Sequence, residues 1–255
     1  MHCGLRPIDA NGTQVDLYYS VEALHWPNKR PLFALDPDKV LPAASVAKLL
    51  IAVASLETLN LGASGASHNR LDRSQSSALR KMILVSDNAA ANELIGWLTV
   101  RRINDTAALL GLTSTHIGGL FIETERDVHA SALTTATDCN KLLGYILMQS
   151  RSRDAFQRSA YRSLIDLMID QHDRRFFGSL GRVIRVADKT GEIHGEINDV
   201  AIINPFQERP LIISMLAYGP FNVYENSVLY DAAVERVSAL ARCLYGAAAR
   251  EATPG

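Results

Sequence analysis

The chain has 255 residues, of which 47% are apolar and 21% are charged, with 16 glycines and 9 prolines. This composition is typical of a folded protein with a large apolar core, and it excludes collagenous and low-complexity polymers. The net charge of −1 provides no basic field, so we expect neither a nucleic-acid partner nor a membrane partner. The longest apolar runs, such as Leu49 to Ala54, are far shorter than the roughly 20 residues of a membrane-spanning helix.

The N-terminus and the cysteines bear on localisation. Residues Met1 to Asp16 contain glycines, a proline and several polar residues, where a secretion signal needs an uninterrupted apolar stretch. Cys3, Cys139 and Cys243 are widely separated and form no CxxC motif, which favours reduced thiols over a disulfide framework. We therefore expect a cytoplasmic protein as the sequence stands, or a periplasmic or secreted one if a signal has been removed.

The spacing of apolar residues changes twice along the chain. Residues 14–36 alternate and are interrupted at Pro27 and Asn28, which predicts a β-hairpin. The next segment, to about residue 173, has helical spacing, and its predicted helices lie at 46–59, 77–85, 89–98, 135–147 and 161–169. The last segment is predicted to form strands at 182–189, 198–204 and 211–217 and a helix at 227–245.

These elements predict an α/β (α+β) fold within a single domain, residues 1–255. An antiparallel sheet lobe flanked by helices would combine residues 1–42 with residues 175–255, because strands occur at both ends of the chain. Residues 43–174 would form an all-α lobe. We expect the active site in the cleft between the two lobes.

A serine and a lysine open the first strong helix, as Ser45-Val46-Ala47-Lys48. Residues at i and i+3 lie on one helix face, so the Lys48 nitrogen can reach the Ser45 oxygen and take its proton if the amine is neutral. A pattern this short also arises by chance, and a serine at a helix start is ordinarily an N-cap. The motif alone is therefore weak evidence of a nucleophile.

Two further triplets have equally plain alternatives. Ser86-Asp87-Asn88 lies between two predicted helices, and these residue types commonly cap a helix start. Lys189-Thr190-Gly191 ends a predicted strand, where glycine is common in the following turn. The order of the three motifs, on a helix start, an interhelix loop and a strand, makes coincidence unlikely.

The ordered set S-x-x-K, S-D-N and K-T-G resembles the serine β-lactamase and penicillin-binding protein superfamily, class A in particular. The resemblance covers about residues 15–245 and implies the β-lactamase/transpeptidase-like fold. Four further segments are similar to class A sequence, namely Leu41–Ser45, Asn88–Asn92, Glu125–Asp127 and Thr134–Asp138.

The resemblance implies a role for each catalytic residue. Ser45 would attack an amide or ester carbonyl and become acylated, with Lys48 as the activating base. A second cation at Lys189 would help Lys48 stay neutral. Ser86 would relay a proton to the departing nitrogen, and Asn88 would position Lys48 and the substrate amide.

The substrate-binding roles follow from the same resemblance. The backbone amides of Ser45 and Glu192 would be the two donors of an oxyanion hole. Lys189 and Thr190 would receive a substrate carboxylate, and Gly191 belongs to the same binding strand.

The chain also departs from class A sequence. The loop pattern E-x-x-L-N, which carries the deacylating glutamate, is missing. Glu123 and Glu125 are the nearest candidates to replace this glutamate, but each is more simply interpreted as a solvated loop carboxylate. The short interval from Ser45 to Ser86 predicts a more open cleft. The N-terminal residues leave little room for the usual first helix, whose place the C-terminal helix or a partner chain would have to cover. His194 would face the substrate or be a surface turn residue.

The resemblance implies a serine hydrolase of class A β-lactamase type that acts on a β-lactam or a related amide or ester. One alternative is an amidase, esterase or acyl transferase for a peptide-like or natural-product substrate. Another is a binding or sensing protein that β-lactams acylate without turnover. The expected partner is a small molecule, and the oligomeric state stays open. The histidines lack metal-like spacing and no phosphate loop is present, so we predict no metal and no cofactor.

Overall fold

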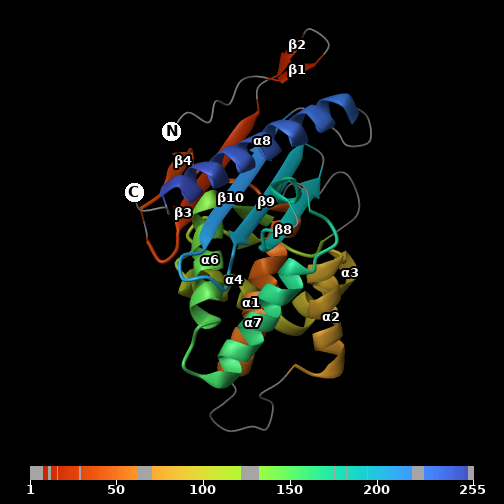
Figure 1. Cartoon of the computed structure of the whole chain (residues 1–255). Coiled ribbons are helices and arrows are strands. Elements are labelled where there is room, and N and C mark those ends of the chain that lie inside the picture. The colour runs from red at the N-terminus through yellow and green to blue at the C-terminus, as the bar shows by residue number, and fades with distance from the viewer. Residues whose placement is uncertain are drawn as a thin grey trace.

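The computed structural model describes residues 8–10, 13–15, 17–28, 30–61, 71–121, 132–174, 176–181, 183–193, 195–219 and 227–251. These residues form an antiparallel sheet with helices on both of its faces, which confirms the predicted fold class (Figure 1). Within them, no helix is both long and apolar enough to cross a membrane.

The main sheet joins strands from the two ends of the chain. Its strands are β3 (Tyr18–His25), β4 (Phe33–Leu35), β8 (Val186–Ile193), β9 (Glu196–Ile203) and β10 (Leu211–Tyr218). The strand order is β4-β3-β10-β9-β8, and every neighbouring pair is antiparallel. β3 and β10 pair over eight residues, from His25 opposite Leu211 to Tyr18 opposite Tyr218. β8, which carries the K-T-G triplet, is an edge strand and leaves one side open to the rest of the site.

The predicted hairpin is confirmed as β3 and β4, although its first strand begins at Tyr18. Val15 belongs to β2 (Thr13–Val15), which pairs with β1 (Ile8–Ala10) in a separate two-stranded sheet. The prediction that K-T-G ends its strand is wrong. β8 continues to Ile193, because Gly191 still pairs with Asn198 of β9.

Among the described residues, the helices follow the predicted order with one addition. They are α1 (Lys48–Leu61), α2 (Arg73–Leu84), α3 (Asn88–Leu98), α4 (Val100–Leu109), α6 (Ala136–Gln149), α7 (Ala155–Ile169) and α8 (Ser227–Glu251), with short 3-10 helices η1 (Ala44–Ala47) and η3 (Phe177–Leu180). α4 was not predicted, because only Ile103, Thr106 and Ala107 of this helix are buried. Half of the residues of α4 are polar or charged, so the segment does not stand out as an apolar one.

α1 is the central helix of the helical layer. Every residue from Leu49 to Ala54 is at most 1% exposed. A helix that is apolar on all sides must be surrounded by protein, and α1 is packed among α2, α3, α4, α6 and α7. Its first residue, Lys48, is therefore held in a rigid and dry place.

Each face of the sheet has its own core. Alternate residues of β10, such as Ile213 and Met215, pack with the apolar side of α8, whereas Ile212 and Leu216 pack with the helical layer. This two-sided burial explains why β10 is a nearly continuous apolar run. In Figure 1, α8 crosses the sheet on the side toward the viewer, so it covers the face for which a covering element was expected.

The cysteine prediction needs a correction. Cys243, on α8, is disulfide-bonded, so the expectation of reduced thiols is wrong for this residue. Cys139, on α6, is a free and buried thiol, and burial raises its pKa to about 12.

A small three-stranded sheet holds the chain just before Ser45. β5 (Leu41–Pro42) pairs with β7 (Ala132–Thr134), which pairs with β6 (His116–Ile117). The amide of Ala43 also donates to the Ala132 carbonyl over 2.9 Å. The strand that leads into the S-x-x-K motif is thus fixed by backbone hydrogen bonds.

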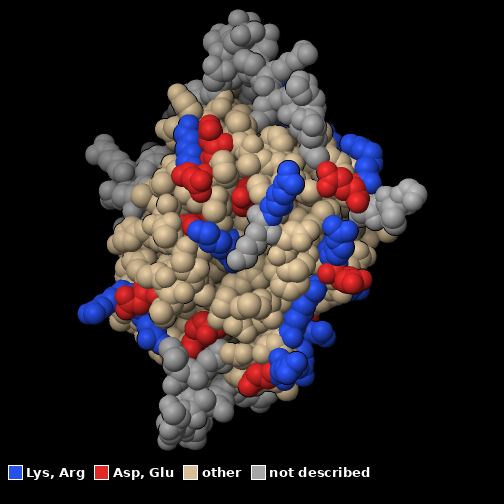
Figure 2. All heavy atoms as spheres, turned by 90° about the vertical axis from the view of Figure 1, so that its left-hand side faces the viewer, with Lys and Arg blue, Asp and Glu red and all other residues tan. Residues whose placement is uncertain are grey.

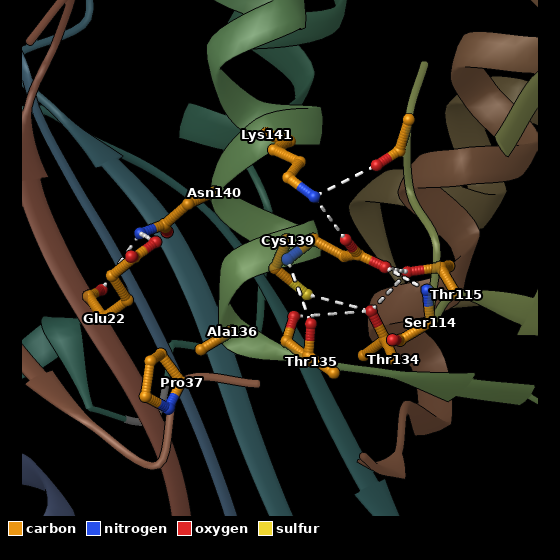
Figure 3. A network of polar contacts seen from close by, with 12 residues as sticks. Glu22, Pro37, Ser114, Thr115, Thr134, Thr135, Ala136, Cys139, Asn140 and Lys141 are labelled. Atoms are coloured by element: carbon orange, nitrogen blue, oxygen red, sulfur yellow. Dashed lines mark hydrogen bonds and ion pairs between the residues drawn. The ribbon is translucent and has the colours of Figure 1, made fainter. Parts of the chain in front are cut away.

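A buried polar network anchors this small sheet to α6 (Figure 3). The Asp138 carboxylate accepts from the Ser114 amide over 2.8 Å and from the Thr115 hydroxyl over 3.0 Å. Its other oxygen pairs with the Lys141 ammonium over 3.1 Å. Thr135 caps the helix by accepting from the Asp138 amide. The network joins the strands beside Ser45 to one rigid helix.

Candidate active site

Ser45 lies in the single turn η1, directly before α1. The Lys48 ammonium donates to the Ser45 hydroxyl oxygen over 2.9 Å, as the i, i+3 spacing predicts. The N-cap position of η1 is Ala43 and forms no side-chain cap bond, so the capping alternative does not describe Ser45. Ala44 has φ +45°, a left-handed conformation that an alanine rarely adopts. Strain of this kind is common beside functional side chains.

Lys48 is fully buried and is surrounded by oxygen atoms. Besides Ser45, its ammonium donates to the Asn88 side-chain oxygen over 2.7 Å, to the Ser86 carbonyl over 2.5 Å and to the Ser86 hydroxyl over 3.1 Å. Burial, and then the charge of Lys189, lower the pKa of Lys48 to about 7, although Asp87 opposes the shift. A substantial fraction of Lys48 is then a neutral amine at neutral pH, as a general base must be.

The S-D-N triplet serves the helix and the site at once. Asp87 is the N-cap of α3 and accepts from the Ala90 amide over 2.8 Å, so the capping interpretation holds for this residue. Ser86 has φ +56°, and this turn carries both its hydroxyl and its carbonyl to Lys48. Asn88 opens α3 and points its amide oxygen at the same lysine.

Lys189 reaches the same point from β8. Its ammonium donates to the Ser86 hydroxyl over 3.1 Å and to the Thr190 carbonyl over 2.9 Å. The Ser86 hydroxyl therefore lies between two lysine nitrogens. Burial lowers the pKa of Lys189 to about 8, while nearby carboxylates, Asp199 and Asp188 foremost, act in the opposite direction.

Gly191 lets β8 approach the nucleophile closely. A Cβ added here would lie 2.9 Å from the Ala43 oxygen and the Val46 nitrogen, and 3.0 Å from the Ser45 nitrogen. Only glycine allows this contact between two backbones. Glu192, the next residue, is half-buried at the open edge of the strand. Glu192, whose backbone amide is expected to complete the oxyanion hole, thus directly follows a residue that packs against η1.

Thr190 has less access to solvent than a ligand-binding hydroxyl usually has. It is 4% exposed, and strand alternation puts its side chain on the face opposite to that of Lys189. Its cross-strand partner is Asp199. The predicted contact between Thr190 and a substrate carboxylate stays a prediction.

Two buried carboxyl groups behind Lys189 were not foreseen. Burial raises the pKa of Asp188 to about 7, although Arg174 lies 3.7 Å away and opposes the shift. Burial and the proximity of Asp188 raise the pKa of Asp199 well above its ordinary value. The sequence does carry a signal of these two groups, because each is an aspartate within an otherwise largely apolar predicted strand. These groups set the charge around Lys189.

Phe121 is a further residue of the site that the sequence did not predict. Its ring centroid lies 5.0 Å from the Lys48 nitrogen, and the residue is 9% exposed. The side chain of Asn92 fixes the backbone of Phe121. Its amide nitrogen donates to the Phe121 carbonyl over 2.9 Å, and its amide oxygen accepts from the Phe121 backbone amide over 2.8 Å. The wall of the site beside Lys48 is therefore apolar.

Three predicted residues lie outside the described part of the chain, namely Glu123, Glu125 and His194. Among the residues that are described, no cluster of three His, Cys, Asp or Glu could hold a metal ion. The face shown in Figure 2 carries basic and acidic side chains next to one another.

Comparisons with known proteins show the family and the fold of the chain. The model of the beta-lactamase enzyme family matches residues 66–247, well over half of the chain. The match includes the S-D-N and K-T-G motifs but begins after Ser45 and Lys48. The contact between these two side chains is therefore known from the structure and not from the family match. A search of curated proteins finds no match.

Solved structures share the fold at low identity. PBP-A is 19% identical with a TM-score of 0.71, and the alignment covers 90% of each chain. A beta-lactamase from Sphaerobacter thermophilus is 18% identical with a TM-score of 0.72, covering 96% of this chain and 95% of that one. A beta-lactamase from Burkholderia ambifaria is 19% identical with a TM-score of 0.72, covering 94% and 96%. The chain belongs to the beta-lactamase enzyme family.

Proposed function

We propose that the protein is a serine hydrolase of class A type, which forms an acyl-enzyme on Ser45 with a β-lactam or a related amide or ester. The observation that carries the proposal is the 2.9 Å contact between the Lys48 nitrogen and the Ser45 oxygen. The lowered pKa of Lys48, about 7, supports its role as the base.

Acylation moves one proton through the site. Neutral Lys48 takes the proton of Ser45 as the serine oxygen bonds to the substrate carbonyl carbon. The carbonyl oxygen gains negative charge, which the amides of Ser45 and Glu192 would stabilise. When the C–N or C–O bond breaks, the leaving group takes a proton from Ser86. Ser86 regains it from Lys48 or Lys189, whose nitrogens both lie 3.1 Å from its oxygen.

The fate of the acyl-enzyme separates the candidate functions. Hydrolysis needs a group that activates water next to the ester. Among the described residues, the ring of Phe121 packs near Lys48, and this ring can neither accept nor donate a proton. This observation favours the alternative of a binding or sensing protein that β-lactams acylate without turnover. An acyl-enzyme complex with penicillin-G is known for a variant of the similar PBP-A.

One experiment tests the proposal and ranks the candidates. The intact mass of the protein is followed over time after addition of a penicillin, a cephalosporin or a fluorophosphonate. A Ser45 adduct with a β-lactam that forms and disappears supports the lactamase, and one that persists supports the acylated protein without turnover. An adduct with the phosphonate alone supports an amidase or esterase. If no reagent labels Ser45, the proposal is wrong.

A further inference from the structure

The segment that follows α7 contacts both halves of the site. The His172 backbone amide donates over 3.0 Å to the carbonyl of Leu84, which ends α2 two residues before Ser86. Farther along, the Phe176 amide donates over 3.3 Å to the Asp199 carboxylate on β9. The segment therefore connects the S-D-N loop with the sheet that carries the K-T-G motif.

Arg174 lies between these two anchor points and joins α7 to β8, which lie next to each other in the fold (Figure 1). Its Nη2 atom donates to the carbonyl of Ile169, the last residue of α7, and over 3.1 Å to the carbonyl of Val186, the first residue of β8. Its Nε atom lies 3.7 Å from the Asp188 carboxylate, with which it forms an ion pair. A planar guanidinium can contact several acceptors in this way, whereas an ammonium group is a point charge on a flexible stem.

The contacts of Arg174 lie on the side of β8 that faces away from the nucleophile. Asp188 is fully buried and, as a diagonal neighbour across β8 and β9, shares a sheet face with Asp199. The next residue, Lys189, points to the opposite face, toward Ser86. Removal of the cation from a buried ion pair is strongly destabilising. Arg174 can therefore fix β8 firmly without touching any reacting atom.

We propose that Arg174 is a positioning residue, which holds β8 where the Lys189 ammonium reaches the Ser86 hydroxyl. The inference rests on the proposed function, in which Ser86 gives its proton to the leaving group. Val186 and Asp188 precede Lys189 by three residues and one residue on the same strand, so a displaced strand moves the ammonium with it. The contact with Ser86 is 3.1 Å long. A shift of about 1 Å would lengthen it beyond a hydrogen bond, and a misplacement of this size can cost about 100-fold in rate.

The test compares two esters that share one acyl group and differ in the leaving group. 4-Nitrophenolate is stable enough to leave without a proton, whereas phenolate is a stronger base and departs faster when Ser86 protonates it. The measurement is the rate at which the first equivalent of phenol is released. Arg174→Met should slow acylation by the phenyl ester about tenfold or more, and acylation by the nitrophenyl ester less than about twofold.

Three further variants separate positioning from charge and from folding. Arg174→Lys keeps a positive charge near Asp188 but not the forked contacts, so it should disfavour the phenyl ester as Arg174→Met does. Arg174→Met combined with Asp188→Asn leaves no unpaired buried carboxylate, so its melting temperature should exceed that of Arg174→Met while the phenyl ester still reacts slowly. This double variant supplies the rates if Arg174→Met does not fold. Arg101→Met removes an exposed arginine of α4 and should leave both rates unchanged.

The possible failures are distinguishable. If the fluorophosphonate labels Ser45 but the Arg174 variants slow both esters alike or slow neither, the positioning role is wrong and the proposed function stands. The same holds if Arg174→Lys reacts with the phenyl ester at the wild-type rate, or if the unaltered, labelled protein cleaves neither ester, since Lys189 would then assist no leaving group of this kind. If Ser45 is not labelled in the unaltered protein, the proposed function fails and the inference fails with it.

Discussion

The ring of Phe121 packs against the buried amine of Lys48, with 5.0 Å between the ring centroid and the nitrogen. A carboxylate at this position could orient a water molecule toward an ester on Ser45, and the ring cannot. We therefore predict that a β-lactam acyl-enzyme accumulates, with a stoichiometric burst before slow turnover. Phe121→Glu should shorten its lifetime by about 100-fold or more, the usual contribution of a general base.

The decay of the acyl-enzyme mass measures this lifetime. Phe121→Gln is the matched control, since it has nearly the shape of the glutamate variant but no base, and its acyl-enzyme should persist. Equally fast decay in the two variants would show that another group, such as Glu123 or Glu125, activates water, and equally slow decay would contradict the prediction.

The nucleophile assignment predicts a clean loss of function. Ser45→Ala should abolish labelling by a fluorophosphonate, because Ser45 lies at the start of the helix that carries Lys48, whose nitrogen is 2.9 Å from the Ser45 oxygen. Ser77→Ala, on the exposed side of α2, is the control and should label like the unaltered protein. Peptide mapping of the adduct to any other serine would contradict the assignment.

The two lysines predict a bell-shaped pH dependence of acylation. The rate should rise as Lys48 loses its proton near pH 7 and fall as Lys189 loses its proton near pH 8, with both pKa values lowered by burial. Asp188→Asn removes a carboxylate that raises the pKa of Lys189, so the descending limb should move to lower pH. The measurement is the labelling rate from pH 5.5 to 9.5.

Lys48→Arg should remove the ascending limb, because arginine stays protonated over this range and cannot act as the base. Acylation by this variant should be at least 100-fold slower at every pH. Circular dichroism would check that the variant is folded. A wild-type rate in folded Lys48→Arg would mean that the base lies elsewhere.

The contact between β8 and η1 predicts that Gly191→Ala is damaging. The new Cβ would lie within 3.0 Å of three backbone atoms of 43–46, which cannot rotate away. We expect at least a tenfold loss in the acylation rate and a lower melting temperature, since overpacking typically costs about 1 to 3 kcal/mol. Gly96→Ala is the matched control, because on α3 its Cβ would meet no atom within 4 Å. A helical Gly→Ala change is usually neutral or stabilising.

The local chemistry of the site could be predicted from the sequence, but much of its surroundings could not. The i, i+3 spacing of Ser45 and Lys48 is a property of one helix and needs no tertiary information. The meeting of Lys189 with Ser86 depends on how the edge strand packs on the helical layer, and it was inferred from the resemblance alone. The predicted end of β8 was wrong, because the sequence does not distinguish a glycine that permits close packing within a strand from a glycine in a turn.

Phe121 and the buried aspartates show a different limit. The role of Phe121 arises from its contact with Lys48, across 73 positions of sequence, and an isolated phenylalanine carries no motif. Asp188 adjoins the K-T-G triplet, but its neighbours Arg174 and Asp199 come from other elements. Such pairs become visible only when the elements are packed.

The pairing of β3 with β10 has a consequence for the order in which the chain is made. Tyr18 to His25 leave the ribosome early, yet their partners, Leu211 to Tyr218, lie 186 to 200 residues further along the chain. Native pairing of so distant a kind is slow to form. Ser45 and Lys48 are therefore synthesised long before Lys189 can join them, and we expect the nascent protein not to react with acyl donors until the C-terminal strands have completed the sheet.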